Sequence, residues 1–589
     1  MNLINKRSQR FIILIGLIGA LPWTLQEAFA CSTLLVGKKA TFDGSVLMSS
    51  SCDGDIMGLI YVMPAQQYSQ GTKLPMYWNL PRPKTHKEYL SNLRKGYDLV
   101  GYLSVEETYR SIIFAGNVEN MTTGGMNEHG LCIAIEFLPM RSGLACKHGV
   151  VGPNSNHWTT SLIANGLMRA RTAREAIRII GGMIEQYGFQ YYRAPHAGVA
   201  LPIADDKEVW LMEIFGPGKN WTADSSKPGG VWCAQRIPDG EIGCSSNRSR
   251  IGKVDLDNHD MFMASSNIYS LAEELGIWKR GSPFVWHDVY GDPGSTYNSL
   301  REWRALSLAA PSLRLQTTGD PTVDRFRFSV KPDKPLTIQR LMGIMRDGYE
   351  GTEFDLTEHP AFNPQGKKSP LARPWGPTEL FDLLDIKPKR ALCTPTSGYV
   401  FIAQLRDWLP DTIGNCLWFA YGPAYTSCFV PIYAGVTDLP DAWDMAPNYT
   451  RINRNQVPWN FRLVFSLANN LRYQEATLDI QHMFRPAETA FLKIQQDVER
   501  TAAKVTTKYG AKGIERFLNS YAEQCLTQVG YAYHELVDYL MFRYLVDHWE
   551  VAPPKLPVIG APVIPIAPDG AWFEASPEKT KQDMDKEFK

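Results

Sequence analysis

The stretch Ala28-Phe29-Ala30-Cys31-Ser32-Thr33-Leu34-Leu35-Val36-Gly37 joins two segments of opposite character. Ahead of it, basic residues precede the apolar run Phe11 to Trp23, and small residues stand at Ala28 and Ala30. This order is typical of a secretory signal peptide with an Ala-x-Ala cleavage site. The apolar run is shorter than a membrane span requires. Cleavage after Ala30 would make Cys31 the first residue of the mature chain.

A cysteine at a new N-terminus carries a thiol nucleophile and a free α-amine in one residue. The amine titrates near ~8 and the thiol near ~8.5, so each group can help to activate the other near neutral pH. We therefore predict that processing creates the active site. Residues 31–37 are rich in strand-forming residues and end in a glycine, which predicts a strand. A nucleophile at the first residue of a strand is held in place by the ladder that follows.

Composition limits what the rest of the chain can do. Its 589 residues exceed one minimal core, so we expect one large domain with accessory elements. The 61 basic residues equal the 61 acidic ones, which argues against nucleic-acid binding. No second long apolar segment is present, so nothing is expected to span a membrane after signal cleavage. The ten cysteines include no C-x-x-C pair and no zinc spacing with histidine. Most of them are predicted to be small apolar residues buried in the core.

Strand-like runs dominate the chain up to about residue 440, and helix patterns interrupt them, among them Tyr297 to Leu308 and Leu336 to Gly348. Residues 154–171 and 173–187 have apolar residues at helical spacing. Two layers of strands flanked by a helix pair suggest a four-layer α/β/β/α sandwich, although alternation alone does not select it over other α+β arrangements. The proline-containing stretch from Pro64 to Val105 is predicted to be irregular.

The character of the sequence changes after Asp441. Long helix patterns follow and are broken near Gly510. A proline-rich and then charged tail ends the chain. The predicted organisation is a signal peptide over 1–30, a catalytic domain over 31–440, a helical C-terminal region over 441–548 packed on the sandwich, and an extended tail over 549–589.

The chemistry of a thiol that attacks an amide sets out what else the site needs: activation, donors for the oxyanion and an acid for the leaving amine. Cys31 can supply the nucleophile, and its own amine can act first as base and then as acid. An acid beside the amine would hold it in position, and Asp53 is the best candidate. The alternative interpretation of Asp53 is a turn aspartate ahead of Gly54.

The sequence from Cys31 to Ser45 resembles the mature start of the N-terminal-nucleophile (Ntn) cysteine dipeptidases, the PepD-like family, which are related to penicillin V acylase and bile salt hydrolase (choloylglycine hydrolase). The resemblance covers roughly residues 31–480 and lies in an ordered series of blocks. These blocks are Gly125–Gly130, Glu208–Glu213, Trp232–Asp239, Ser246-Asn247, Tyr297–Arg304, Arg346–Thr352 and the region Leu409 to Gly435. The last two resemble dipeptidases rather than acylases.

This resemblance implies an α+β fold, the four-layer αββα Ntn-hydrolase sandwich, with no metal or other cofactor and with dipeptides or short peptides as substrates. Carried over by position, Cys31 is the nucleophile, Asp53 orients the amine, and Asn247 offers its side-chain amide to the oxyanion. Arg304 matches the arginine near the nucleophile, which would favour the thiolate. Arg301 is the less favoured alternative in the same helix. Asn247 could instead be a turn residue, and Arg304 a surface arginine.

One run departs from the family. Its members commonly carry Arg-Asn-x-Asp where this chain has Ser50-Ser51-Cys52-Asp53. Ser50 removes a permanent positive charge, so the thiolate or a substrate carboxylate loses support unless another cation compensates. Cys52 could form a disulfide, modulate the nucleophile, or fill the space of the arginine.

The leading prediction is therefore an exported cysteine dipeptidase, periplasmic or extracellular or attached to the cell surface, whose partner is its peptide substrate. An acyl-amide hydrolase of the penicillin V acylase or bile salt hydrolase type stays open. So does a lipoprotein lipidated at Cys31, although such sites prefer an aliphatic residue where Ala28 stands. Because Ser50 replaces the arginine of the family, an enzyme that has lost its activity is a further alternative. The sequence does not determine the oligomeric state.

Overall fold

The structure is a computed structural model, and the predicted signal peptide and most of the predicted tail lie outside the residues that it describes. Those residues are 31–53, 58–77, 99–115, 122–146, 148–153, 155, 158–191, 197–294, 296–375, 383, 386, 389–444, 451–546, 551, 554, 564–565 and 572–573.

A seven-stranded antiparallel sheet carries the start of the described chain. Its strand order is β17-β15-β1-β2-β18-β19-β20. The strands are β17 (Ser329–Val330), β15 (Ile242–Ser245), β1 (Thr33–Val36), β2 (Val46–Asp53), β18 (Ser397–Leu405), β19 (Cys416–Tyr421) and β20 (Val430–Tyr433). The strand predicted over 31–37 is confirmed as β1. It pairs on one side with β15 and on the other with β2, so it lies inside the sheet.

A second, nine-stranded antiparallel sheet packs against the first. Its order is β16-β14-β13-β12-β10-β9-β8-β3, with β11 also pairing with β12. The strands are β16 (Phe262–Ala264), β14 (Val231–Arg236), β13 (Val209–Phe215), β12 (Ala197–Ala204), β11 (Glu136–Pro139), β10 (Cys132–Ala134), β9 (Thr122–Asn127), β8 (Ser111–Ala115) and β3 (Leu59–Met63).

Strand β13 explains why the second sheet needs cover on both faces. Successive side chains of a strand point to opposite faces. Leu211 and Phe215 join the core that contains β1 and β2. Trp210 and Met212 join a separate core with the helices of the outer layer. Because both faces are buried, the strand is apolar almost throughout.

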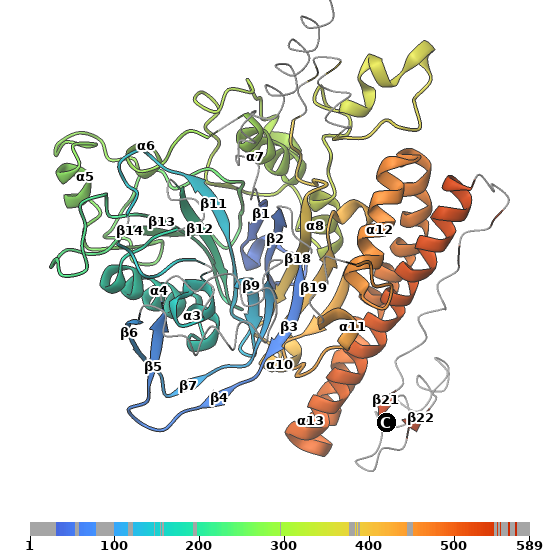
Figure 1. The fold of residues 1–589 in the computed structure, drawn as a ribbon, viewed down its shortest axis with the longest axis horizontal. Helices are drawn as coiled ribbons and strands as arrows, with labels where there is room; N and C mark the ends of the chain where they lie inside the picture. Colours follow the sequence, from blue (N-terminus) through green and yellow to red (C-terminus); the bar gives the residue numbers. More distant parts are fainter. Residues whose placement is uncertain are drawn as a thin grey trace, which may run out of the picture.

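Helices cover the outer faces of both sheets, so the layers run helix, sheet, sheet, helix (Figure 1). On the nine-stranded sheet lie α3 (Leu162–Arg169) and α4 (Ala173–Tyr187). Helix α4 confirms the helix predicted over 173–187, whereas α3 covers only part of the helix predicted over 154–171. Ser161 and Thr172 cap them through side-chain oxygens that accept backbone N–H groups. On the seven-stranded sheet lie α8 (Ile338–Met345), α12 (Val457–Asn470) and α13 (Tyr473–Leu540). The predicted α+β sandwich with a helical C-terminal region is confirmed.

The break predicted near Gly510 is confirmed inside α13. Gly510 has φ 64° and ψ −159°, which is not helical. The two halves of α13 then run antiparallel, since the Tyr539 hydroxyl donates to Asp479 at 2.8 Å and the rings of Phe484 and Tyr533 are 4.9 Å apart. This helical hairpin lies beside α12 along one side of the molecule (Figure 1).

The stretch predicted to be irregular contains two short ribbons, so that prediction is wrong in part. Strand β5 (Lys73–Tyr77) pairs with β6 (Leu99–Ser104), and β4 (Gln66–Gln67) pairs with β7 (Glu107–Thr108). Pro75 lies inside β5, which tolerates it because each strand of a two-stranded ribbon has an unpaired edge. Prolines marked this region as loop, but tertiary pairing overrides that local signal.

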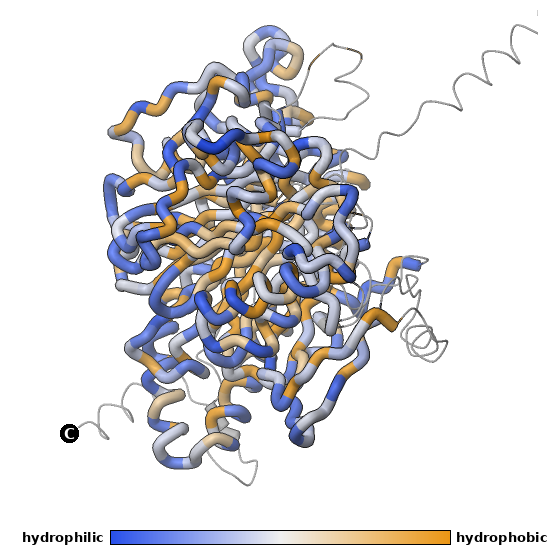
Figure 2. The backbone as a smooth tube through the Cα atoms, turned by 90° about the vertical axis from the view of Figure 1, so that its left-hand side faces the viewer, coloured by the Kyte–Doolittle hydropathy of each residue, from blue (hydrophilic) through white to orange (hydrophobic). Residues whose placement is uncertain are grey.

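The remaining described elements are short, apart from α7 (Thr296–Ala309), which borders the site. They are η1 (Lys38–Ala40), η2 (Trp158–Thr160), α5 (Ser270–Glu274), α6 (Trp286–Val289), η3 (Pro311–Leu313), η4 (Leu356–Glu358), η5 (Pro360–Phe362), η6 (Pro364–Gly366), α10 (Asp411–Gly414), η7 (Ala424–Thr426), α11 (Asp441–Asp444), η8 (Met541–Leu545), β21 (Ile564–Pro565) and β22 (Trp572–Phe573). Figure 2 shows that hydrophobic segments gather in the interior. Among the described helices, none combines the length and the apolar character needed to cross a bilayer.

Candidate active site

Cys31 lies directly ahead of β1 and is only 2% exposed. The backbone N–H of Ser51 donates to the carbonyl of Ser32 at 3.0 Å, and Thr33 pairs with Ser50 in the ladder. Continuing this antiparallel register from Thr33 and Ser50 by two residues sets Cys52 opposite Cys31, at a position without ladder hydrogen bonds, where side chains lie closest. The nucleophile candidate and the unusual cysteine are therefore cross-strand neighbours.

The arginine that contacts Cys31 is Arg301, which α7 presents fully buried. Its Nη1 donates to the Cys31 carbonyl at 2.7 Å and to Ser32 Oγ at 3.0 Å. Its Nη2 donates to Asn247 Oδ1 at 3.0 Å. A single guanidinium thus joins the predicted nucleophile to the predicted oxyanion donor.

Arg304, predicted from the resemblance to lie near the nucleophile, instead faces another loop. Its Nε and Nη2 donate to the two carboxylate oxygens of Asp347 at 2.8 and 2.7 Å. Its Nη2 also donates to the carbonyl of Glu350 at 2.7 Å. Residues three apart on a helix occupy neighbouring but different directions, and the packing of α7 turns Arg301 toward β1. The placement of Arg304 is thereby corrected in favour of Arg301.

Asn247 follows β15 in a left-handed backbone conformation, with φ 63°. Asparagine adopts this conformation more readily than other residues that carry a side chain. Its Oδ1 accepts from Arg301, and its Nδ2 donates to the carbonyl of Phe137 at 3.0 Å. A guanidinium cannot accept and a carbonyl cannot donate, so these partners define which way the amide points. Asn247 is both a turn residue and, through Arg301, linked to the Cys31 carbonyl.

Asp53 is the last residue of β2 and is fully buried. Ser397 Oγ donates to one carboxylate oxygen, and Arg390 Nη2 donates to the other at 3.1 Å. Burial raises the pKa of Asp53, while the charges of Arg390 and Arg301 and the hydrogen bond from Ser397 act in the opposite direction. The carboxylate predicted to orient the amine is therefore held from β18 and the loop ahead of it.

The surroundings of Cys31 oppose ionisation of its thiol. A hydrogen bond with the Cys52 thiol, burial, and the negative charges of Asp53 and Glu136 raise the pKa of Cys31 well above its usual range. Residues 1–30 precede Cys31 in this chain, so its nitrogen is a peptide amide and cannot serve as a base. In a chain that still carries residues 1–30, the α-amine that is predicted to activate the thiol is therefore absent.

Glu136 is a member of the site that the sequence analysis missed. It is the first residue of β11 and is fully buried. Ser245 Oγ donates to its Oε2 at 2.6 Å, and the backbone N–H of Asn247 donates to the same oxygen at 3.3 Å. Burial raises the pKa of Glu136 to about 7. An acidic residue inside the apolar run from Leu131 to Phe137 was the available signal.

We call the set of buried groups around the nucleophile candidate the thiol cluster, and it consists of Cys31, Cys52, Asp53, Glu136, Asn247 and Arg301. Among the described residues, no group of three or more histidine, cysteine, aspartate and glutamate side chains could hold a metal ion. All ten cysteines are reduced and buried, including Cys132 and Cys416, which confirms their interpretation as small core residues.

A second buried set, the ion-pair cluster, lies next to the thiol cluster and consists of Arg248, Arg250 and Glu302. Arg248 Nε donates to Glu302 Oε1 at 3.1 Å, and Arg250 Nη1 donates to Glu302 Oε2 at 2.8 Å. Arg248 also donates to the carbonyl of Asp324 at 2.8 Å. The two guanidiniums thus share one buried carboxylate, which suits a structural role.

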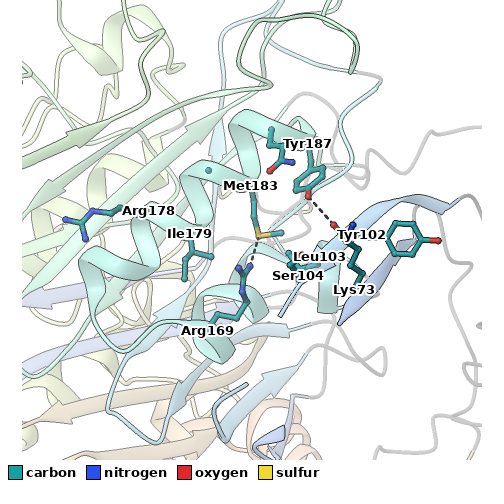
Figure 3. A pocket seen from close by; sticks show the side chains of 11 residues that line it. Lys73, Tyr102, Leu103, Ser104, Arg169, Arg178, Ile179, Met183 and Tyr187 are labelled. Atoms are coloured by element: carbon teal, nitrogen blue, oxygen red, sulfur yellow. Dashed lines mark hydrogen bonds between the residues drawn. The ribbon is translucent and has the colours of Figure 1, made fainter. Parts of the chain in front are cut away.

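A surface cavity of about 460 Å³ lies between α4 and the β5–β6 ribbon (Figure 3). Its lining is Lys73, Tyr102, Leu103, Ser104, Arg169, Arg178, Ile179, Gly182, Met183, Gln186 and Tyr187. No member of the thiol cluster lines it. Figure 3 shows Arg169 directed at Met183 and Arg178 extending away from the other basic side chains. The cavity is therefore separate from the candidate active site.

Comparisons with known proteins point to one family. The model of peptidase family C69 matches residues 30–485. A probable dipeptidase from Salmonella dublin is 24% identical over 432 residues, which cover 72% of this chain and 84% of that protein. Dipeptidase A from Lactobacillus helveticus is 22% identical, with 74% and 82% covered. A dipeptidase from Bifidobacterium longum is 23% identical, with 77% and 81% covered. A solved structure, a mutant of conjugated bile acid hydrolase from Clostridium perfringens, has 11% identity and a TM-score of 0.17, covering 43% of this chain and 68% of that one.

Proposed function

The chain belongs to peptidase family C69, and on that premise we propose that it hydrolyses dipeptides with the Cys31 thiol as nucleophile. The observation that carries this proposal is the Arg301 guanidinium, which binds the Cys31 carbonyl and the Asn247 amide together. Relatives that match most of the chain are named dipeptidases, which supports the choice of substrate.

Export and activation form the second part of the proposal. Residues 1–30 carry the features of a signal peptide, and the proposed enzyme acts in the periplasm or outside the cell after their removal. Removal would also convert the Cys31 amide into an amine. That amine supplies the base that the buried thiol lacks in the full chain.

The proposed reaction uses this amine twice. The thiol proton passes to the α-amine, and the sulfur attacks the carbonyl carbon of the dipeptide, whose oxygen becomes an oxyanion. The ammonium then returns the proton to the leaving nitrogen as the oxyanion collapses and the C–N bond breaks, which releases the amine and leaves a thioester. Water hydrolyses this thioester, which releases the carboxylic acid and restores the thiol. Asp53 would hold the ammonium by charge, and Asn247 would donate to the oxyanion. Arg301 would fix the distance between nucleophile and donor, because it contacts both residues.

The test combines the mass of the mature N-terminus with a substrate panel. We expect a chain that starts at Cys31, cleaves dipeptides, and loses that activity by at least about a thousandfold in Cys31→Ala. Cys416→Ala, which removes a buried thiol in β19, is the matched control and should stay active. Cleavage of acyl-amino acids or bile-salt-type amides alone would instead identify an acyl-amide hydrolase. A diacylglyceryl mass on Cys31 would identify a lipoprotein, and full activity in Cys31→Ala would exclude the assigned nucleophile.

A further inference from the structure

We propose that Arg390 is the positioning residue that supports the charge of the Asp53 carboxylate, as a cation supplied from outside β2, where Ser50 carries none. This inference rests on the proposed function, because it assigns Arg390 an effect on the proposed α-ammonium partner. Arg390 acts through Asp53 and need not touch the substrate.

The contacts of Ser50 show that no cation occupies its position on β2. Thr33 Oγ1 donates to Ser50 Oγ at 3.0 Å, and Ser50 is 2% exposed. The pair of hydroxyls fills the space between β1 and β2 at this point. Any positive charge that supports Asp53 must therefore come from another element.

Arg390 supplies such a charge from the loop ahead of β18. Its Nη2 donates to Asp53 Oδ2 at 3.1 Å and to Thr396 Oγ1 at 3.3 Å. The Tyr349 hydroxyl donates to the Arg390 carbonyl at 2.7 Å. Both ends of the residue are anchored, so the guanidinium is held against the carboxylate.

Arg301 also favours the charged form of Asp53 through its charge, whereas the ion pair of Asp53 is with Arg390. Arg301, from α7, directs its hydrogen bonds to Cys31, Ser32, Ser246 and Asn247. The thiols of Cys31, ahead of β1, and Cys393, ahead of β18, carry no positive charge. A fully buried carboxylate stays charged only when it is paired and hydrogen-bonded. Among the described residues, Arg390 is the cation that forms an ion pair with Asp53.

The experiment compares Arg390→Met with Arg390→Lys across pH. We expect Arg390→Met to move the acidic limb of kcat/KM for a dipeptide upward by about one to two pH units, because an adjacent opposite charge shifts a carboxyl pKa by that order. Arg390→Lys keeps the charge and should restore most of the wild-type profile. Arg174→Met, which breaks a comparable ion pair with Glu208 on the outer sheet, should leave the profile unchanged.

Several outcomes would overturn the inference. One is an acidic limb that Arg390→Met leaves in place, and another is an equal shift in the Met and Lys variants. A rise in KM alone, seen with free dipeptides but not with dipeptide amides, would assign Arg390 to the substrate carboxylate. Circular dichroism shows whether the Arg390→Met variant folds. If this variant does not fold, the test rests on Arg390→Lys, whose kcat/KM must keep the acidic limb of the wild type. A wild-type protein that cleaves no dipeptide would defeat the proposed function instead.

Discussion

The two buried polar clusters meet at consecutive residues of α7, since Arg301 belongs to the thiol cluster and Glu302 to the ion-pair cluster. In the ion-pair cluster, two guanidiniums bind one carboxylate directly. In the thiol cluster, Arg301 directs its hydrogen bonds to carbonyl, hydroxyl and amide oxygens. Glu136 is held by a hydroxyl and a backbone N–H instead of by a cation.

This difference in pairing separates Glu302, whose charge helps to hold the fold, from Glu136, which can exchange a proton. Asp53 is intermediate, because it is buried in the thiol cluster but paired with Arg390. Burial raises the pKa of Glu136 to about 7, and the pKa values of Asp53 and Cys31 are also raised. Buried groups with strongly displaced pKa values are typical of functional sites. We therefore expect damage to the ion-pair cluster to reduce stability, and damage to the thiol cluster to reduce activity.

Glu302→Gln should have the largest effect, because it leaves two buried guanidiniums without their carboxylate. We expect the free energy of unfolding to fall by about 3–5 kcal/mol, measured by urea denaturation at pH 7. Asp538→Asn breaks an ion pair in which Asp538 is exposed, and should cost less than about 1 kcal/mol. An unchanged urea midpoint in Glu302→Gln would remove the contrast between the two clusters.

Arg301→Lys should act mainly on catalysis. Lysine keeps the charge but cannot hold Cys31 and Asn247 at once with a planar fork. We expect kcat/KM for dipeptides to fall about a hundredfold, as for the loss of an element that orders an oxyanion site. Steady-state kinetics and a parallel urea titration separate the two effects. A variant that loses stability but keeps its kcat/KM would place Arg301 with the structural charges.

Glu136→Gln tests the pH dependence of the thiol cluster. Since the folded pKa of Glu136 lies above its unfolded value, the folded state binds more protons between about pH 4.5 and 7. Stability from this group is therefore present at low pH and is lost as the pH rises toward 7, by roughly 2–3 kcal/mol. Urea unfolding at pH 5 and pH 8 should show this loss in the wild type and a smaller one in Glu136→Gln. Equal losses in both proteins would contradict the assignment.

Arg304→Lys should have the smallest effect. It keeps the charge but loses one hydrogen bond of a largely buried, two-pronged pair with Asp347, so we expect a loss of about 1–2 kcal/mol in unfolding free energy. We expect kcat/KM to stay within about twofold of the wild type, because Arg304 is directed away from the thiol cluster. A fall in kcat/KM as large as that of Arg301→Lys would support the sequence-based prediction that Arg304 acts near the nucleophile.

The two arginines also show how far the sequence could lead. Cys31 and Asn247 stand in short blocks whose order along the chain resembles a family, so their positions could be proposed. Which of Arg301 and Arg304 faces β1 depends on the rotation of α7 about its axis, and that rotation is set by packing. Glu136 could not be assigned to the site, because an acidic residue in an apolar strand does not show which other strand its side chain contacts.

The fold was predictable where the local pattern and the tertiary packing agree. Helices α3 and α4 have apolar residues at helical spacing, and Gly510 interrupts a helix pattern at a residue suited to a positive φ. The β5–β6 ribbon was not predictable, because a proline in the strand argues against pairing. The approach of Arg390 to Asp53 joins residues 337 positions apart, and no short-range pattern reports such a contact.

The central position of β1 has a practical consequence for labelling. Free chain ends usually fray, but a chain that begins at Cys31 would begin between two paired strands, with little freedom to lose when it binds a substrate. Acetylation of the Cys31 amine would remove the base and leave the sulfur free, whereas alkylation of the Cys31 thiol would block the nucleophile and leave the amine free. An affinity tag ahead of Cys31 would act like the acetyl group, so a tag for purification belongs after Lys589.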